Sequence, residues 1–328
     1  MQNVNLTKAA KDGVFPDFYY TTTNLETYIR LNCRLIKVEN IEMDKGIKVN
    51  PLRKSAGCIC GNLVKKGDLI VVGEAGVKVE EFKDKKEKVF FGFMGSEISS
   101  ERNKDFLIRR VAWMMKKIKK QGGKILFVGG PAIVHTGGGR YLAEIIKKGF
   151  VDILFAGNAL AVHDLEEQFF GTSLGFEFKK GDFTVGGNHH HLWTINLVRK
   201  HGSIGNFLKA EKIKKGIMYE CLRKKINFVL AGSIRDDGPL PEVITDTQEA
   251  QYRMRRLVQD NRVKMAIMCA TTLHSIAAGN LLSAEVEKVV VDINQAMITK
   301  LADRGTTNTV GIVTDTEPFL KELSKNLN

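Results

Sequence analysis

The sequence predicts an α/β protein in which a doubly wound, mainly parallel sheet follows a small β-rich domain. Six short apolar runs after residue 120 show no polar/apolar alternation, which is typical of strands covered on both faces, and helical patterns lie between them. Before residue 81, short β-like runs are separated by turn signals, and no long amphipathic helix fits between them. We therefore expect a β-rich domain over residues 1–90 and an α/β domain over residues 91–328.

The β-rich part is predicted from five runs between residues 17 and 80. They are FYYTTT (18–23), TYIRL (27–31), RLIKVEN (34–40), DLIVVG (68–73) and VKVE (77–80). Turn signals such as NPLRKSAG and KKGD separate them, so a small barrel or sandwich is expected. A charged and then glycine-containing connector follows over residues 81–105.

The α/β part begins with a predicted helix over residues 104–121, whose apolar residues recur at helical spacing and which ends at a glycine pair. The strand-like runs after it are KILFVGG (124–130), VDILFAGN (151–158), INFVLAGS (226–233), MAIMCATT (265–272), KVVVDIN (288–294) and TVGIVTD (309–315). Each run ends in small or polar residues. Because ligands of open parallel sheets bind beyond the carboxyl ends of the strands, we expect these endings to meet around one crevice.

The composition is that of a globular protein, with 43% hydrophobic and 27% charged residues. No apolar stretch reaches the ~18 residues of a membrane span, and no signal peptide is visible, so we expect a cytoplasmic protein without a membrane partner. The net charge of +13 is spread over interleaved acids and bases, which argues against nucleic acid and leaves anionic ligands favoured. The five cysteines show no pairing pattern and are expected to be reduced and structural.

A glycine-rich stretch, FVGGPAIVHTGGGRYLAEII (127–146), follows the first of the six runs and precedes a helix. Glycines let backbone N–H groups approach phosphate oxygens, so this is a candidate phosphate loop. Its spacing matches neither G-x-G-x-x-G nor G-x-x-x-x-G-K-[ST], which excludes a simple Rossmann or P-loop motif. A purely structural connection is the alternative.

The run VVVDIN places Asp292 at the end of a late strand, where a carboxylate can accept hydrogen bonds from a ribose diol. Asn294 is placed to bind the ribose or the adenine edge. Although Asp292 can also be a simple helix cap, its combination with the glycine-rich stretch favours a dinucleotide such as NAD.

The densest polar cluster is Arg235, Asp236 and Asp237 in AGSIRDDGPLPEVITD, just after a predicted buried strand. Adjacent acids can hold an ammonium group and an arginine can hold a carboxylate, so the cluster suits an amino acid with a cationic side chain. The alternative is a solvated Asp-Asp-Gly-Pro turn.

The sequence contains seven histidines, a residue type that serves as a metal ligand or as an acid–base group. His189, His190 and His191 are consecutive and do not face one point, and no metal motif occurs, so we expect no metal. His135, His163 and His274 lie at strand or loop ends and are better acid–base candidates, with a structural role as the alternative.

The order of motifs resembles the archaeal ornithine cyclodeaminase family almost end to end. The same conserved region occurs in lysine-oxoglutarate reductase/saccharopine dehydrogenase enzymes and in the C-terminal part of cyanobacterial arginine dihydrolase/ornithine cyclodeaminases. The matching blocks are GVFPDFYYTTTNLETYIRL, VENIEMD, FMGSEISSE, GGPAIVHTGGGRYLAEII, VDILFAGNALAVHDLE, GTSLG, GIMYEC, FVLAGSIRDDGPLPEVITD, LHSIAAGNLL and VVVDINQAMITKLADRG.

The resemblance implies a deoxyhypusine-synthase-like NAD-binding domain and conversion of L-ornithine to L-proline and ammonia with NAD recycled. Members usually carry a further N-terminal segment, which we expect this chain to lack, and a homo-oligomer is plausible. With the strand endings, the resemblance gives the expected NAD contacts: Gly129, Gly130, Pro131, Ala132, Thr136, Gly137, Gly138, Gly157, Asn158, Ala159, Gly232, Ser233, Thr271, Thr272, Asp292 and Asn294.

The catalytic assignments come from the residues themselves. Arg235 suits a carboxylate clamp and Asp236 and Asp237 suit the amines, while the base is expected among His135, His163 and Asp164. The segment GSEISSERN (95–103) is a candidate lid, with an interdomain linker as its alternative. Two other functions stay open: another NAD-dependent enzyme acting on an amino-acid or polyamine amine, either a dehydrogenase or a deoxyhypusine-synthase-like transferase, and a non-catalytic NAD-sensing module.

Overall fold

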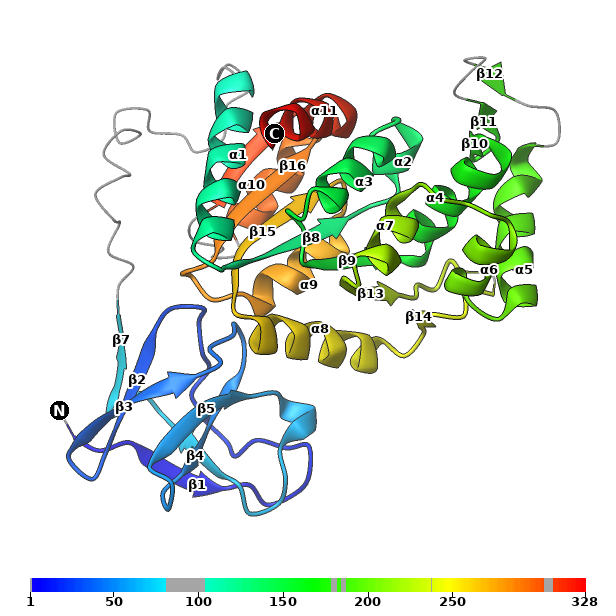
Figure 1. Cartoon of the computed structure of the whole chain (residues 1–328). Coiled ribbons are helices and arrows are strands. Elements are labelled where there is room, and N and C mark those ends of the chain that lie inside the picture. Colours follow the sequence, from blue (N-terminus) through cyan, green and yellow to red (C-terminus); the bar gives the residue numbers. More distant parts are fainter. Residues whose placement is uncertain (1, 81–103, 178–181, 184–186, 237, 304–308) are drawn as a thin grey trace. The chain divides into compact units, whose positions relative to one another are not determined.

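The computed structural model describes residues 2–80, 104–177, 182–183, 187–236, 238–303 and 309–328 (Figure 1). The chain divides into two compact units. The first is formed by Met1–Gly95 with Ala278–Val286 and Ala302–Asn308, and the second by Ser96–Ala277 with Glu287–Leu301 and Thr309–Asn328. The boundary expected at residue 90 lies outside the described residues and stays a prediction, as does the candidate lid.

The first unit is built on a seven-stranded sheet of order β1-β6-β4-β5-β3-β2-β7. Its pairs are antiparallel except β3 with β5, and alternate residues of β2 are buried, among them Ile29. A β-rich first part is therefore confirmed. The strands are β1 (Asn5–Lys8), β2 (Thr27–Leu31), β3 (Arg34–Glu39), β4 (Gly46–Asn50), β5 (Ser55–Ile59), β6 (Leu69–Val72) and β7 (Val77–Val79), with a short 3-10 turn η1 (Gly61–Leu63).

Several details of this unit differ from the sequence prediction, and the strands β1 and β4 were not among the predicted runs. The run at 18–23 is not a strand: Tyr19 makes a single bridge to Val72, and Phe18 has a positive φ of 58° that interrupts extended backbone. The segment read as a turn, NPLRKSAG, contains the start of β5 at Ser55. Small residues give β5 a weak strand signature, and its pairing with β4 overrides that local preference.

The second unit contains a seven-stranded parallel sheet of order β14-β13-β9-β8-β15-β16-β17. All six predicted strands are present, and β14 is an additional short edge strand. A separate antiparallel sheet joins β10, β11 and β12. The strands are β8 (Lys124–Gly129), β9 (Ile153–Gly157), β10 (Thr172–Ser173), β11 (Phe176–Glu177), β12 (Asp182–Phe183), β13 (Asn227–Ala231), β14 (Val243–Ile244), β15 (Val263–Cys269), β16 (Glu287–Asp292) and β17 (Thr309–Val313).

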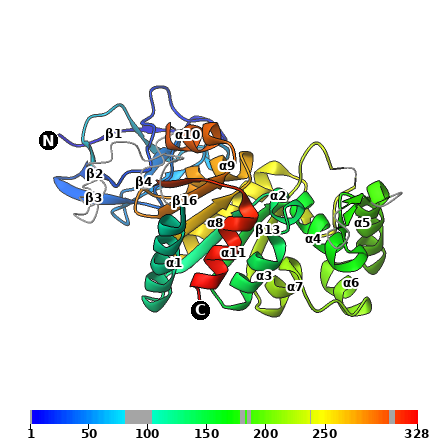
Figure 2. The same ribbon diagram turned by 90° about the horizontal axis from the view of Figure 1, so that it is seen from above.

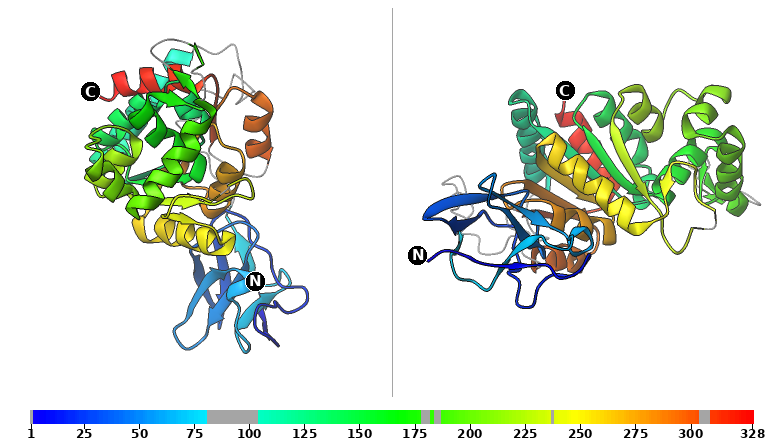
Figure 3. Two further views of the ribbon diagram at one scale, coloured as in Figure 1. Left: turned by 90° about the vertical axis from the view of Figure 1, so that its right-hand side faces the viewer. Right: turned by 90° about the horizontal axis from the view of Figure 1, so that it is seen from below.

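Helices cover both faces of the parallel sheet. Figure 2 shows α1, α3, α7 and α11 along one side and α9 and α10 along the other, and Figure 3 shows α8 on the face opposite α11. The helices are α1 (Lys104–Lys120), α2 (Ala132–His135), α3 (Gly139–Lys147), α4 (Asn158–Phe170), α5 (His190–His201), α6 (Ile204–Ala210), α7 (Ile217–Arg223), α8 (Thr247–Asn261), α9 (Leu273–Leu281), α10 (Gln295–Asp303) and α11 (Thr316–Asn326), with a 3-10 turn η3 (Gly187–His189).

Burial explains the continuous apolar runs of the sequence. Phe127 of β8, Phe155 of β9 and Ile267 of β15 are each fully buried, since helices pack on both faces of these strands. The doubly wound, mainly parallel α/β fold is confirmed. Among the described residues, no helix is long and apolar enough to cross a membrane.

The strand order defines where a ligand would bind. From β8 the chain proceeds outward to β9 and β13, whereas from β15 it proceeds in the other direction to β16 and β17. The neighbours β8 and β15 therefore flank a topological switch point, and ligands of open α/β sheets bind beyond the carboxyl ends of the strands at such a point.

Candidate functional site

The loops after β8 and β15 approach each other closely at the switch point. The N–H of Gly130 donates to the carbonyl of Cys269 at 2.9 Å. A side chain at Gly130 would place its Cβ 1.7 Å from the carbonyl oxygen of Ala270. Gly129 is the last residue of β8, Pro131 caps α2 and Ala132 begins it. The glycine at position 130 is thus required by the contact between two backbones.

The second half of the glycine-rich stretch is held by α11. The hydroxyl groups of Thr136 and Thr316 lie 2.6 Å apart. Gly137 has a positive φ of 83° as the chain leaves α2, and a Cβ at Gly138 would lie 3.1 Å from Leu320. These three predicted cofactor residues have an evident structural task, and their contact with a cofactor stays a prediction.

The end of β15 turns sharply into α9. Ala270 has a positive φ of 52° and its N–H donates to the carbonyl of Val291 in β16. The hydroxyl of Thr271 lies 3.4 Å from Nδ1 of His274, and that of Thr272 contacts the sulfur of Met297 at 3.1 Å. Both predicted threonines therefore lie at the carboxyl end of the sheet.

Asp292 and Asn294 lie together at the end of β16. The carboxylate of Asp292 accepts the N–H of Asn294 at 2.9 Å, and the side-chain oxygen of Asn294 accepts the N–H of Ala296 at 3.0 Å, at the start of α10. The side chain of Ile293, between them, is 74% exposed. Asn294 is a helix cap here, whereas the carboxylate of Asp292 remains partly exposed at the edge of the sheet.

The end of β9 is occupied by Gly157, Asn158 and Ala159, where α4 begins. The buried side-chain oxygen of Asn158 accepts the N–H of Leu240 at 3.1 Å and so anchors the loop that follows β13. A Cβ on Gly157 would lie 3.0 Å from Cε1 of His274, so the imidazole of His274 reaches across to the end of β9.

The polar loop after β13 is a compact turn. The N–H of Gly232 donates to the carbonyl of Ile244, the carboxylate of Asp236 accepts the N–H of Ser233 at 2.7 Å, and the hydroxyl of Ser233 accepts the N–H of Arg235 at 3.1 Å. The side chain of Arg235 is exposed, and Asp237 lies outside the described residues.

The charge of Asp236 connects this turn to His274. Burial lowers the pKa of His274, and the negative charge of Asp236 opposes that change. His274, which the sequence suggested as an acid–base group, therefore lies among the ends of β9, β13 and β15.

Asp164 has a structural position. Its fully buried carboxylate accepts the N–H groups of Ile217 and Met218, each at 2.8 Å, at the start of α7. Burial raises the pKa of Asp164 to about 7, against the lowering effect of these two hydrogen bonds. The geometry makes Asp164 a helix cap and leaves His135 and His163 as the better-placed base candidates.

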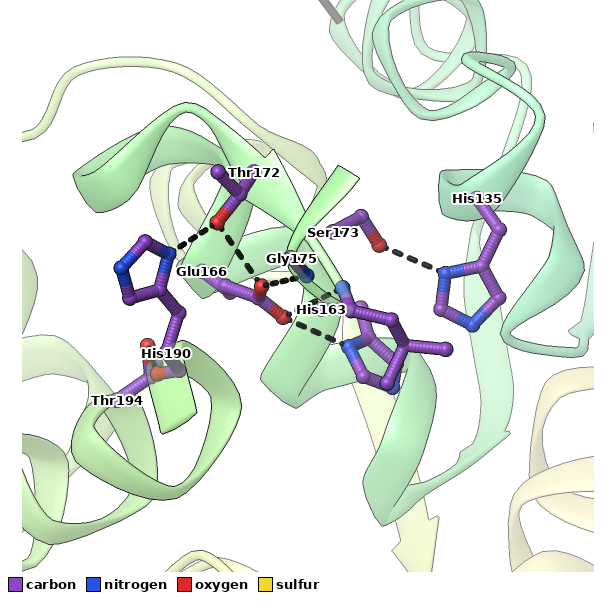
Figure 4. A network of polar contacts seen from close by, with 9 residues as sticks. His135, His163, Glu166, Thr172, Ser173, Gly175, His190 and Thr194 are labelled. Carbon is purple, nitrogen blue, oxygen red and sulfur yellow. Dashed lines mark hydrogen bonds and ion pairs between the residues drawn. The ribbon is translucent and has the colours of Figure 1, made fainter. Parts of the chain in front are cut away.

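His135 and His163 belong to a network that Figure 4 shows in close view. Their ring centroids are 4.4 Å apart, although one residue ends α2 and the other lies in α4. Nδ1 of His163 lies 3.0 Å from the carboxylate of Glu166, and Nδ1 of His135 lies 2.7 Å from the hydroxyl of Ser173. Burial, followed by the neighbouring His163, lowers the pKa of His135 to about 4.

The network continues from Glu166 to α5. The hydroxyl of Thr172 donates to Glu166 at 3.0 Å and lies 2.7 Å from Nδ1 of His190 (Figure 4). Burial acts to raise the pKa of Glu166, but the hydrogen bond and charge of His163 and the donors from Leu174 and Thr172 hold it below its ordinary value. Glu166 is thus an ionised, fully buried carboxylate.

Family models match most of the chain. Residues 109–323 match the Rossmann-fold region of the C-terminal part of arginine dihydrolase ArgZ-like proteins, and residues 26–108 match the first region of the same part. The ornithine cyclodeaminase of Methanothermobacter thermautotrophicus is 48% identical over 98% of this chain and 78% of its own length.

The chain belongs to the ornithine cyclodeaminase family. The resemblance noted in the sequence is thereby confirmed. A crystal structure of a conserved LOR/SDH-type protein from Methanococcus maripaludis covers 100% of this chain and 98% of its own, with 45% identity and a TM-score of 0.92. The bifunctional enzyme AgrE of Nostoc, solved with ornithine and NAD⁺, is 40% identical over 99% of this chain and 46% of its own, with a TM-score of 0.66.

In this member of the ornithine cyclodeaminase family, Glu166, Thr172 and Ser173 were not predicted from the sequence, and His190 was weighed there only as a metal ligand. One signal was available: His163 and Glu166 are three residues apart, a spacing that places two side chains on one helix face. Within the described part of the chain, no group of three or more His, Cys, Asp or Glu side chains is arranged to hold a metal ion.

Proposed function

We propose that this protein is an NAD-dependent ornithine cyclodeaminase, which converts L-ornithine to L-proline and ammonia. Archaeal relatives with that name support the proposal, and so does the AgrE structure, which is a complex with ornithine and NAD⁺. The observation that carries it is structural: two adjacent histidines, His135 and His163, follow β8 and β9, next to the switch point where a dinucleotide would bind.

The residues around β15 and β16 fit a dinucleotide. Asp292 ends β16, the strand that pairs with β15, and a carboxylate at the end of such a strand can accept hydrogen bonds from the ribose diol of NAD. The Asn294 N–H engages one oxygen of this carboxylate, which restrains its orientation. Leu273 and Ile293 are each 74% exposed and offer apolar surface for a heteroaromatic ring.

The loop after β8 suits the phosphate groups of the dinucleotide. Because Gly130 has no side chain, its backbone lies directly against Ala270, and nothing projects from this position over the switch point. We infer that Gly129 to Ala132 and Thr271 to Thr272 approach the dinucleotide, while Thr136, Gly137 and Gly138 hold the loop against α11.

The chemistry requires control of protons and water. A bound nicotinamide would supply the acceptor, and later the donor, of the hydride at the α-carbon of ornithine. The α-ammonium group must first lose a proton, and His163, oriented by Glu166, is placed for that task. The exposed guanidinium of Arg235 suits the substrate carboxylate, and Asp236 beside His274 suits the second amine.

An isotope experiment tests the proposal. L-ornithine deuterated at the α-carbon and labelled with ¹⁵N at the α-amine is incubated with protein and substoichiometric NAD. The expected products are proline that retains the deuterium and ammonia that carries the ¹⁵N, with turnover exceeding the NAD present. Absence of proline from a protein that binds NAD would refute the cyclodeaminase assignment.

The alternative functions give different results in the same experiment. A dehydrogenase would convert NAD to NADH stoichiometrically and release the labelled hydride into it, and a sensing module would bind NAD without turnover. A transferase of the deoxyhypusine-synthase type needs a lysine in the site to form an imine. Lys288 is buried, but it lies near the amino end of β16, away from the carboxyl edge.

A further inference from the structure

We propose that Glu166 is a positioning residue of the active site: it fixes His163 with Nδ1 protonated and thereby makes His163, rather than the adjacent His135, the proton acceptor for the substrate ammonium group. This inference rests on the proposed function. Glu166 is not among the site residues predicted from the sequence.

The carboxylate of Glu166 is held on all sides. One oxygen accepts the Thr172 hydroxyl at 3.0 Å and the N–H of Gly175 at 3.4 Å. The other accepts the N–H of Leu174 at 3.2 Å and faces Nδ1 of His163 at 3.0 Å. An ionised carboxylate accepts about four hydrogen bonds and donates none, so this arrangement suits a fixed negative charge.

A hairpin loop directs two backbone N–H groups at the carboxylate of Glu166. Leu174 and Gly175 form the two-residue loop between β10 and β11, and both have positive φ, at 50° and 79°. This is the conformation of a type I′ hairpin turn, which leucine adopts at a cost. The cost is offset because both N–H groups of the loop bind the carboxylate.

The hydrogen bonds determine the tautomer of His163. Since the ionised Glu166 can only accept, Nδ1 of His163 must carry a proton, which leaves Nε2 as the basic atom when the ring is neutral. A similar argument applies to His190 of α5. Because the Thr172 hydroxyl donates its hydrogen bond to Glu166, Nδ1 of His190 must donate to the Thr172 oxygen.

His135 cannot take the same role at the same time. Its ring is 4.4 Å from that of His163, and two imidazolium ions at this separation in a buried site would repel strongly. Glu166 stabilises a positive charge on His163, whereas Ser173 offers His135 only a neutral hydroxyl. Both rings are therefore neutral before reaction, and His163, with Glu166 as its counter-charge, is the ring of the pair that accepts a further proton.

Three other ionisable side chains lie near this pair. From α5, His191 lies with its ring 6.1 Å from that of His163, and His190 is one hydroxyl removed from Glu166. Asp164, on the same helix as His163, is engaged by the N–H groups of α7. The donated proton moves from the substrate ammonium to Nε2 of His163, and the imidazolium so formed is balanced by Glu166.

The first test is spectroscopic and needs no turnover. In ¹⁵N–¹H spectra of the histidine side chains at neutral pH, with the signals assigned through a His163→Gln variant, His163 should show a protonated Nδ1 and an unprotonated Nε2. A protonated Nε2 with a bare Nδ1 would overturn the proposal.

The second test is kinetic. Glu166→Gln should lower kcat for proline formation by about 10- to 100-fold, the usual effect of losing an orienting carboxylate, while the KM for ornithine and the Kd for NAD change less than threefold. The acidic limb of the pH profile of kcat/KM should move to lower pH, since His163 loses its counter-charge.

Glu167 provides the matched control. It is the next residue of α4 and half-buried, the hydrogen bonds of His135 and His163 go to Ser173 and Glu166 rather than to Glu167, and burial raises the pKa of Glu167. Glu167→Gln should leave both the rate and the pH profile unchanged.

If Glu166→Gln retains at least half of the wild-type kcat with an unmoved acidic limb, the proposal is wrong. If that variant does not fold, the spectrum of the wild-type protein decides. Absence of proline formation by the wild type would instead refute the proposed function, a result distinct from either of these.

Discussion

The imidazole ring of His135 lies against that of His163, with the ring planes inclined by 59°, although the two residues come from different helices. Burial and this neighbour lower the pKa of His135 to about 4. His135 is therefore neutral at physiological pH. Its lowered pKa links the site to the stability of the protein, because a histidine in the unfolded chain binds its proton near pH 6.5.

The first prediction concerns that linkage. Since the pKa of His135 is lower in the folded state, its contribution to stability is fully present above pH 6.5 and is lost as the pH falls through about 4. His135→Gln keeps a polar group beside Ser173 but does not titrate. Between pH 7 and pH 4, the wild type should lose about 1–2 kcal/mol more free energy of unfolding than the variant, after allowance for solvent screening. Denaturant titrations at several pH values measure this; parallel curves would contradict it.

The second prediction concerns Asp292. Asp292→Asn keeps the hydrogen bond to Asn294 but removes the charge that would face a ribose diol. The Kd for NAD should rise about 10-fold or more, the effect of weakening charge-assisted hydrogen bonds. Calorimetry without ornithine measures it. Asp260→Asn, at an exposed position of α8, is the control, and equal Kd values for both variants would exclude Asp292 from the cofactor site.

The third prediction concerns the close approach at the switch point. Gly130→Ala would place a Cβ 1.7 Å from the Ala270 carbonyl oxygen, so the β8 and β15 loops must separate. We expect a loss of stability of about 2–4 kcal/mol together with weaker NAD binding. Gly205→Ala in α6, where the nearest neighbour is 3.8 Å away, should be neutral or stabilising by up to about 1 kcal/mol. Thermal unfolding of both variants checks the contrast.

The fourth prediction separates a cap from a base. Asp164→Ala leaves two N–H groups of α7 without their acceptor, which should destabilise the fold by about 2–4 kcal/mol. The kcat of the folded fraction should stay within about twofold of the wild type. Unchanged stability with turnover lost would return Asp164 to the list of possible bases.

Much of the α/β architecture could be predicted because a strand that is buried on both faces has a continuous apolar sequence. The continuous apolar runs of β8, β9 and β15 follow from covering both faces of each strand, and six of the seven strands were expected. In contrast, β5 was missed, because its stability comes from pairing with β4 and not from its own residues.

The candidate site was predictable only where a residue type and its place along the chain agreed. Asp292 ends a predicted strand, so it could be predicted to bind a ribose. His135 lies in a glycine-rich stretch, so it could be predicted as an acid–base group. Glu166 resembles any surface acid of an amphipathic helix, and its burial depends on the hairpin loop of Leu174 and Gly175 folding back over it. Such tertiary contacts are invisible to patterns of sequence spacing.

The hydrogen bond between the hydroxyl groups of Thr136 and Thr316 joins two residues that are 180 positions apart and are therefore synthesised at different times. The glycine-rich loop is synthesised long before α11, yet it is held in place by that helix. A ribosome must therefore add some 180 further residues before the loop acquires its final neighbour. The strands β15, β16 and β17 also come late in the chain, so the carboxyl edge of the sheet, like the contact between Thr136 and Thr316, is completed only near the end of synthesis.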